Sequence, residues 1–427
     1  MSRAGRAGIA AGALVAALVA MASAAAVAVA EPIAIVGAKV LVRPGETLDG
    51  ATVIVDRGVI TAVGVGVAVP AGARIIDGTG KQVSAGFIEA GSGVGLVGVA
   101  LEAVDVDGRF GDRDPIHDDR VHAAYQARDG WDPGAVAIPI SRAAGVTAVI
   151  AAPAGGLIAG QSAAYSLGDG VREPLRSPAA MEAALGAGAG DGSRGRAIEL
   201  VREVLDDARA YAADPAAYER NARRTMIADR LDLVALGPVR RGALPLVIDA
   251  RAEADIRAAL RLAAEQKLTI AIAGGAEAWR VAPELAAARV PVLIDPVDNL
   301  PARLDAIDVR DDAIAILARA GVPVVITSLG DPMRTRTLRQ LAGIAIANGL
   351  TRDQALAAVT TAPAALYGLT GRGALTRGAV ADLVVWSGDP FELATAAEVV
   401  IIGGAVQPRR DHQTRLLDRY RRLPPAP

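Results

Sequence analysis

The chain has 427 residues, of which 52% are apolar, 22% charged and only 3% aromatic, a composition typical of a folded protein with a large aliphatic core rather than a disordered chain. The formal net charge is −2 with both signs interspersed, which gives no basic footprint for a nucleic acid. The absence of cysteine excludes disulfides, thiolate metal sites and a cysteine nucleophile.

The N-terminal segment has the pattern of an export signal. Arg3 and Arg6 precede a run of small and apolar residues from Gly8 to Ala30. We predict a signal peptide over residues 1–30, whose cleavage leaves an exported protein in the periplasm or outside the cell. The alternative is an uncleaved membrane anchor, because about 20 apolar residues suffice to span a bilayer. No other segment is a credible membrane span.

Short β-rich runs occur near both ends of the chain. Alternating apolar residues between Gly, Pro and Asp turns favour antiparallel strands over residues 33–77. Similar runs return as ADLVVWSGDP at 381–390 and EVVIIGGAV at 398–406. We predict that residues 31–85 and 373–410 pair into one small composite β-sandwich.

Between these ends, buried strands alternate with helices. Continuous apolar runs fit parallel strands covered on both faces, and they lie at 146–152, 244–250, 268–274, 290–295 and 322–328. Repeated β–α units predict a (β/α)8 TIM-like barrel over residues 86–372, with a doubly wound sheet as the rival fold. Residues 411–427 are expected to form a C-terminal helix or tail.

Two regions interrupt the barrel rhythm. Residues 105–133 are rich in Asp, Arg and Gly and indicate a long loop after the first barrel strand. Residues 193–224 indicate a long charged helix that is interrupted near Asp214-Pro215, and its surface is a plausible homodimer contact. Later, Thr351 and Gln354 have the spacing of a capping box at the start of a helix.

Three segments occur in an informative order: IIDGTGKQVSAGFIEA at 75–90, GLTRDQALAAVTTAPAALYGL at 349–369 and RGALTRGAVADLVVWSGDP at 372–390. They resemble the passage from sandwich to barrel, the last helix and the return to the sandwich in the amidohydrolase superfamily, particularly the imidazolonepropionase-like amidohydrolases. The resemblance implies a metal site at the carboxyl-terminal mouth of the barrel and hydrolysis of amide or related C–N bonds. Such a metal lowers the pKa of bound water towards about 7, so that hydroxide can attack.

The resemblance also implies where the metal ligands belong, and most of those positions hold residues without a donor atom. The histidine positions are Gly91 and Gly93 after the first strand, Asp249 after the fifth, and Gly274 after the sixth, or Ala273 with a one-residue slip; the aspartate of the eighth strand falls on Leu329. We therefore expect no metal cofactor at the usual site. The chain is interpreted as a degenerate hydrolase, retained for binding a small molecule at the barrel mouth or a partner chain.

The alternative is an active hydrolase with a relocated metal site. Asp249, Asp295 and Asp331 lie at or just after strand ends, and three carboxylates can bind Mg²⁺, Ca²⁺ or Mn²⁺. Asp295 and Asp331 each precede a proline, which equally fits a role in bracing loops.

Histidine offers few further donors. The chain contains His117, His122 and His412. His117 and His122 could join Asp118 or Asp119 around a metal, although an ordinary polar loop fits as well. His412 fits a solvated helix face.

Three further side chains are candidate ligand contacts. Gln161 lies in GGLIAGQSA, where a glycine-rich hairpin with a buried glutamine is the other interpretation. Glu277 and Trp279 follow a strand end in GGAEAW, where the tryptophan also fits a packing role.

Overall fold

The computed structural model describes residues 31–110, 120–186, 188–190, 192–220, 222, 224–298, 300–301, 303 and 305–421. The predicted signal peptide, His117, Asp118 and Asp119 lie outside the described residues, as does the end of the C-terminal tail.

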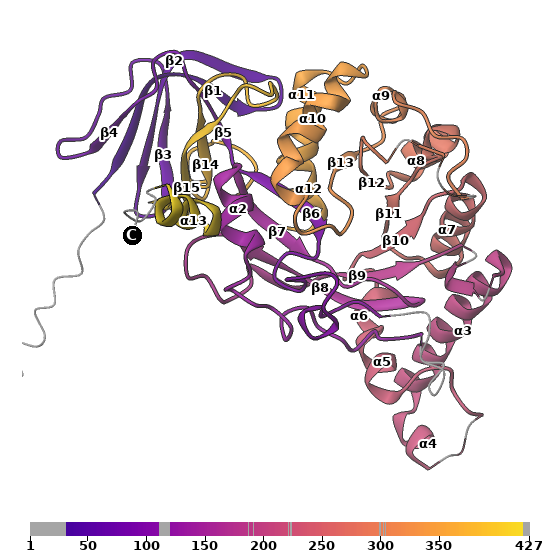
Figure 1. Cartoon of the computed structure of the whole chain (residues 1–427). Coiled ribbons are helices and arrows are strands. Elements are labelled where there is room, and N and C mark those ends of the chain that lie inside the picture. The colour runs from indigo at the N-terminus through magenta and orange to yellow at the C-terminus, as the bar shows by residue number, and fades with distance from the viewer. Residues whose placement is uncertain are drawn as a thin grey trace, which may run out of the picture.

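Both ends of the chain form one eight-stranded sheet, as the sequence predicts (Figure 1). The N-terminal part supplies β1 (Ile33–Arg43), β2 (Glu46–Asp56), β3 (Val59–Gly64), β4 (Arg74–Asp77) and β5 (Gln82–Ala85), and the C-terminal part supplies β14 (Leu383–Trp386), β15 (Ala397–Ile402) and β16 (Ala405–Val406). The two parts join where β5 and β14 pair antiparallel, with Leu383 opposite Ala85. The edge strand β3 bridges Val380 just before β14, so the sheet curls back on itself around an aliphatic core.

A second eight-stranded sheet forms the barrel. Its strands follow one another in chain order: β6 (Phe87–Ser92), β7 (Val146–Ala151), β8 (Ile158–Ser166), β9 (Arg176–Ala184), β10 (Leu246–Ala250), β11 (Ile270–Gly274), β12 (Val292–Ile294) and β13 (Val324–Ile326). The first and last strands come close enough for the sheet to be nearly closed. Gly330, just after β13, donates its N–H to the Gly91 carbonyl of β6 at 2.9 Å. This closure gives the predicted TIM-like barrel.

One strand departs from the parallel pattern. β8 runs antiparallel to both β7 and β9. The connections to it span only residues 152–157 and 167–175. Parallel neighbours need a crossover of roughly a dozen residues, so these short connections require hairpins.

Helices surround the barrel (Figure 1). They are α2 (Ala137–Ala143), α3 (Arg194–Ala213), α4 (Pro215–Glu219), α5 (Arg230–Ala235), α6 (Gly237–Arg240), α7 (Glu253–Gln266), α8 (Ala282–Ala288), α9 (Ala313–Arg319), α10 (Leu338–Ala347), α11 (Arg352–Val359) and α12 (Thr361–Leu366). Of these helices, α4 and α5 lie in a lobe that extends away from the barrel. The long charged helix predicted after Ser193 is α3, and α4 follows the break at Asp214. The capping box of Thr351 and Gln354 opens α11 as expected.

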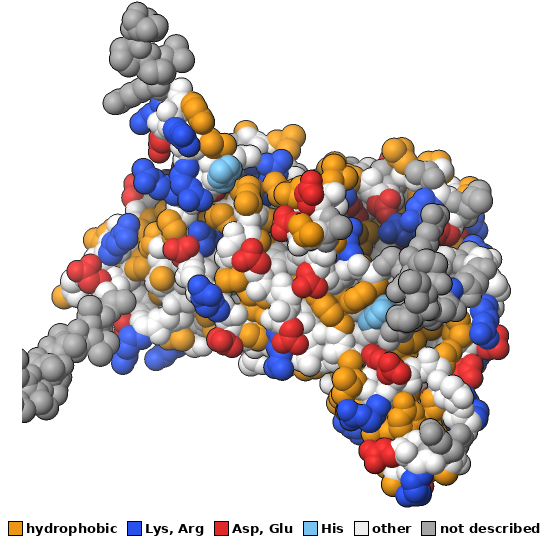
Figure 2. Space-filling model, turned by 60° about the horizontal axis from the view of Figure 1, so that its bottom comes forward, with side chains coloured by type: hydrophobic (Ala, Val, Ile, Leu, Met, Phe, Trp, Pro, Cys, Tyr) orange, Lys and Arg blue, Asp and Glu red, His pale blue; other side chains and the backbone are white. Residues whose placement is uncertain are grey.

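The surface carries both signs of charge, and side chains of each are spread over the face shown in Figure 2. The C-terminal helix α13 (His412–Tyr420) buries none of its residues. Among the described residues, no helix combines the length and the apolar character that a membrane crossing requires.

Candidate functional site

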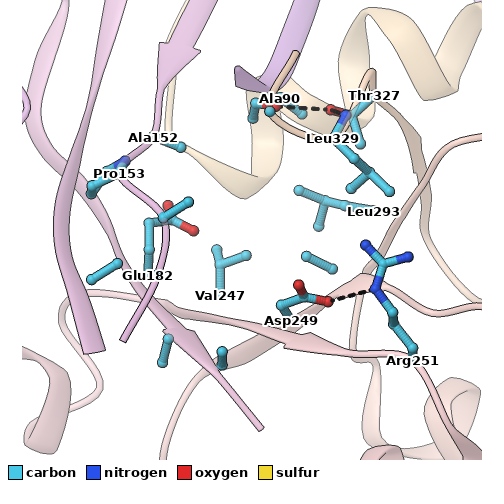
Figure 3. Close-up of a pocket in the computed structure, with 18 of the residues that line it drawn as sticks. Ala90, Ala152, Pro153, Glu182, Val247, Asp249, Arg251, Leu293, Thr327 and Leu329 are labelled. Carbon is cyan, nitrogen blue, oxygen red and sulfur yellow. Dashed lines mark hydrogen bonds and ion pairs between the residues drawn. The ribbon is translucent and has the colours of Figure 1, made fainter. Parts of the chain in front are cut away.

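A cavity of about 160 Å³ lies at the carboxyl ends of the barrel strands (Figure 3). This is the end at which barrel enzymes place their sites. Small and apolar residues form most of its wall, including Ala90, Ala152, Ala273 and Leu293. The polar side chains that reach it are Glu182, Asp249, Arg251, Thr327 and Tyr367.

Glu182 comes from β9 and points into the space between the strands (Figure 3). Its Oε1 atom is buried and has no hydrogen-bond partner. Desolvation raises the pKa of Glu182 to about 7, although the Ser162 hydroxyl opposes this rise. The site therefore contains a carboxyl group poised between its neutral and charged forms near neutral pH.

Asp249 lies on the neighbouring strand β10 and is paired with a cation. Arg251 Nε lies 3.5 Å from Asp249 Oδ1, and the same guanidinium also binds Asp298. Burial raises the pKa of Asp249, while Arg251 and Arg303 act in the opposite direction. The carboxylate is thus oriented by an arginine.

Tyr367 closes the cavity from the segment after α12. Its hydroxyl donates to the Ala90 carbonyl at 2.6 Å. Burial raises the pKa of Tyr367 well above its ordinary value, and the nearby carboxyls of Glu182 and Glu89 act in the same direction. The phenol therefore stays neutral and braces β6.

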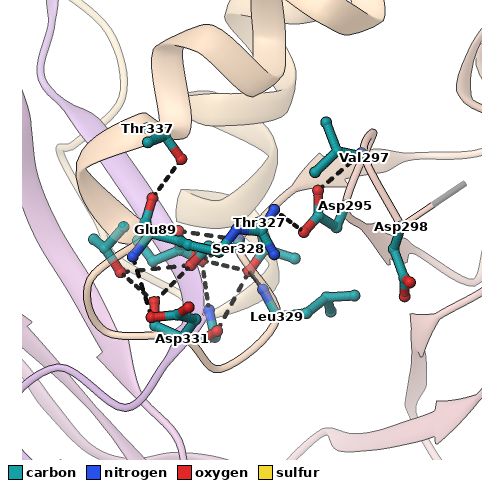
Figure 4. Close-up of polar contacts among 12 residues, drawn as sticks. Glu89, Asp295, Val297, Asp298, Thr327, Ser328, Leu329, Asp331 and Thr337 are labelled. Atoms are coloured by element: carbon teal, nitrogen blue, oxygen red, sulfur yellow. Dashed lines mark hydrogen bonds and ion pairs between the residues drawn. The ribbon is translucent and has the colours of Figure 1, made fainter. Parts of the chain in front are cut away.

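A buried carboxyl group joins the first and last barrel strands (Figure 4). Glu89 on β6 is completely buried and accepts a hydrogen bond from Thr327 and from the Ser328 N–H at 3.1 Å. The Gly91 N–H donates to it at 3.3 Å. Desolvation raises the pKa of Glu89 to about 7 despite these donors. Because its oxygens point to β13 and the turn after it, Glu89 fixes the closure of the barrel.

The positions at which the resemblance implies metal ligands do not fit a metal ion. Gly91, Ala273 and Leu329 line the cavity and offer no side-chain donor. A Cβ atom on Gly274 would lie 2.8 Å from Asp249 Oδ1, and one on Gly93 would lie 3.1 Å from the Gly330 carbonyl oxygen. The Gly330 backbone therefore crowds position 93 and the Asp249 side chain crowds position 274, so a side chain returned at either position would have to displace its neighbours.

The carboxylates proposed for the alternative oxygen site bind different partners and do not converge. Asp331 accepts the Met333 N–H at 2.8 Å and so caps the turn after β13 (Figure 4). Asp295 pairs with Arg334 at 2.6 Å and accepts the Val297 N–H at 3.0 Å. Neither lines the cavity with Asp249. Across the described ranges, which leave out 111–119, no group of three or more His, Cys, Asp and Glu is arranged to hold a metal.

The three remaining candidate contacts also have partners away from the cavity. Gln161 on β8 donates through Nε2 to the Ala123 carbonyl at 2.9 Å. Glu277 accepts the backbone N–H groups of Glu253 and Asp308. Trp279 Nε1 donates to the Asp308 carbonyl at 3.0 Å. The structure thus gives each of these side chains a hydrogen-bond partner in the protein, and none of the three lines the cavity.

Of the described histidines, His122 stacks on Phe110 with ring centroids 4.0 Å apart, and His412 begins α13.

Comparisons with known proteins agree with this architecture. A model of the amidohydrolase family matches residues 318–407, the last part of the barrel and the return to the end sheet. An amidohydrolase from Thermotoga maritima MSB8 is 26% identical with a TM-score of 0.79, and the match covers 88% of this chain and 100% of that one. No curated protein matches the chain significantly.

Two more distant structures share the fold alone. A prolidase complexed with N-methylphosphonate-L-proline is 18% identical with a TM-score of 0.53, covering 89% of this chain and all of that one. Phenylurea hydrolase B is 15% identical with a TM-score of 0.54, covering 89% and 97%. The family model and the Thermotoga structure show that the chain is similar to the amidohydrolase superfamily, and these two structures add only that the fold is shared.

Sequence reasoning identified Asp249 but missed Glu182, Arg251, Thr327 and Tyr367. Glu182 lies in RSPAAMEAA, an alanine-rich segment without the β-branched residues that mark a strand. Glu182 is the one polar residue between Ala179 and Ala184, so no alternation of polar and apolar residues marks this segment as a strand.

Proposed function

We propose that this chain binds a small organic molecule at the barrel mouth and does not hydrolyse it through a metal-bound water. We further propose that it is a degenerate relative of the imidazolonepropionase-like amidohydrolases, on the strength of the three segments between residues 75 and 390. The observation that carries the proposal is the donor set around the cavity.

Asp249 is the only cavity-lining residue among the implied ligand positions that retains a donor atom. It already has a counter-ion in Arg251, whose positive charge would repel a divalent cation. A catalytic metal contributes several kcal/mol to transition-state stabilisation, and the arginine-paired Asp249 with the single further carboxyl of Glu182 does not replace that contribution. The cavity itself remains suited to binding, because apolar walls with a few convergent polar groups are typical of ligand sites.

The test is a hydrolysis screen over acyl-amino acids, dipeptides and cyclic amides, with and without added Zn²⁺, Mn²⁺ or Mg²⁺. We expect no turnover that depends on the metal. Metal-dependent turnover that Asp249→Ala abolishes would contradict the proposal and favour the relocated oxygen site.

We also propose that the protein is exported. The support is the basic start and the small apolar run of residues 1–30. Expression of the full chain followed by cell fractionation and N-terminal sequencing should yield a periplasmic or secreted form that begins near Glu31. A membrane-bound product that retains Met1 would show an uncleaved anchor instead.

A further inference from the structure

Among the polar side chains that line the cavity, Glu182 is the one whose carboxyl is incompletely hydrogen-bonded. Thr327 donates to Glu89, Tyr367 donates to Ala90, and Arg251 lies between two carboxylates. Glu182 lines the same cavity, and its buried Oε1 atom has no hydrogen-bond partner. An unsatisfied buried polar atom costs roughly 1–3 kcal/mol, so the Glu182 carboxyl, which lines the cavity, favours a ligand that brings a donor to it.

The charges around Glu182 decide which kind of donor suits it. Asp249 adds a second acidic group to the wall, and the single cation Arg251 is shared between Asp249 and Asp298. Once Glu182 ionises, the lining carries more negative than positive charge. An anionic ligand is therefore repelled, a neutral one gains a single hydrogen bond, and a cation gains a charge-assisted bond in a poorly solvated site.

The size and walls of the cavity define the rest of the ligand. Its volume is about 160 Å³, and alanine, valine and leucine side chains supply much of its surface. An apolar cavity of about 150 Å³ is large enough to hold benzene. The space thus suits one ring or a short branched chain that carries a polar head.

We infer that the cavity takes a small amine, with its ammonium group bound by Glu182 and its apolar body packed against the alanine-rich wall. This inference names the ligand class and rests on the proposed binding function.

Proton release should accompany such binding. The groups that face Glu182 are Ser162 on β8, Asp249 and Arg251 at the end of β10, and the neutral phenol of Tyr367 after α12, with Glu89 on β6 behind it. Because the pKa of Glu182 is about 7, the carboxyl is largely protonated below neutral pH and must lose its proton to pair with an ammonium. Amine affinity should therefore fall by about tenfold between about pH 8 and about pH 6.

Three probes of matched shape test the inference: benzylamine, benzyl alcohol and benzoate. Titration calorimetry on the full mature protein should give the tightest binding for benzylamine at about pH 8, by about tenfold over benzyl alcohol, with benzoate weakest. At about pH 6, where Glu182 is largely protonated, comparison of buffers with different ionisation enthalpies should reveal the released proton.

The variant Glu182→Gln keeps the shape of the side chain and should remove both the preference for benzylamine and the pH dependence. Glu173→Gln makes the same change at an exposed position outside the cavity and should leave both intact.

The failures can be told apart. If benzyl alcohol or benzoate binds as tightly as benzylamine, or if Glu182→Gln keeps the preference, the amine inference is wrong while ligand binding at the cavity stands. If none of the three probes binds, the inference and the binding function are both overturned.

Discussion

Glu89 and Glu182 both have buried carboxyl oxygens, but they have different roles. Burial raises the pKa of both Glu89 and Glu182 to about 7. Glu89 accepts bonds from backbone and hydroxyl donors of β6 and of the turn after β13, whereas Glu182 leaves an oxygen without any partner. The satisfied carboxyl holds the barrel together, and the unsatisfied one faces the cavity.

Removing the Glu89 carboxyl should therefore lower the free energy of unfolding, whereas removing the Glu182 carboxyl should not. Glu89→Ala leaves the N–H groups of Ser328 and Gly91 and the Thr327 hydroxyl without their acceptor, and we expect a loss of about 3 kcal/mol in the free energy of unfolding. Glu182→Gln removes a carboxyl whose charged form is disfavoured by desolvation and whose Oε1 atom has no partner, so stability should stay constant or rise. Denaturant unfolding at neutral pH measures both, and a loss in Glu182→Gln as large as that in Glu89→Ala would contradict the distinction.

The same pKa values predict how stability depends on pH. Each glutamate has its pKa raised from 4.5 to about 7, so the folded protein holds protons that the unfolded chain has already released. Stability should therefore fall as pH rises from about 4.5 to about 7, by at most about 1.4 kcal/mol per pH unit for each group, and this contribution should be constant above that window. In thermal unfolding across this range, Glu182→Gln should show a shallower fall than the wild type. An unchanged slope would mean that Glu182 is charged in the folded protein.

At the scale of elements, the sequence predicts the strands that are rich in β-branched residues and misses those that are not. VTAVIAA and LPLVIDA become β7 and β10 within the predicted ranges. The hairpin strand β9 is hidden because alanine carries little strand preference, and its pairing with β8 depends on connection lengths that only the fold reveals. As β9 supplies Glu182, the missed strand is also the missed part of the site.

β8 also holds the preceding loop, residues 120–127, against the barrel. Gln161 Nε2 binds the Ala123 carbonyl, and the Gln161 backbone exchanges hydrogen bonds with Tyr125 and Ala127. Gln161→Ala removes only the side-chain bond and should cost about 1 kcal/mol. Hydrogen exchange should show faster amide exchange over residues 120–127 with the barrel strands unchanged. A uniform change over the whole barrel would contradict this local role.

At the scale of the whole molecule, the end sheet and the barrel have the fold of the amidohydrolases that the chain resembles. The barrel mouth holds Asp249, which is paired with an arginine, and Glu182, whose Oε1 atom has no partner. The resemblance in sequence could locate the strand ends, because motifs around Glu89 and Asp382 mark the junctions between the two sheets. It could not locate the cavity walls, since these depend on which side of each short strand faces inward.

The metal content of the full mature protein tests this view of the barrel mouth most directly. The protein should be purified without chelators, incubated with Zn²⁺ or Mn²⁺, dialysed and analysed for bound metal. We predict a content far below one ion per chain, with no difference between the wild type and Asp249→Ala. A stoichiometric ion that is retained by the wild type and lost from Asp249→Ala would contradict the claim that the cavity binds its ligand without a metal.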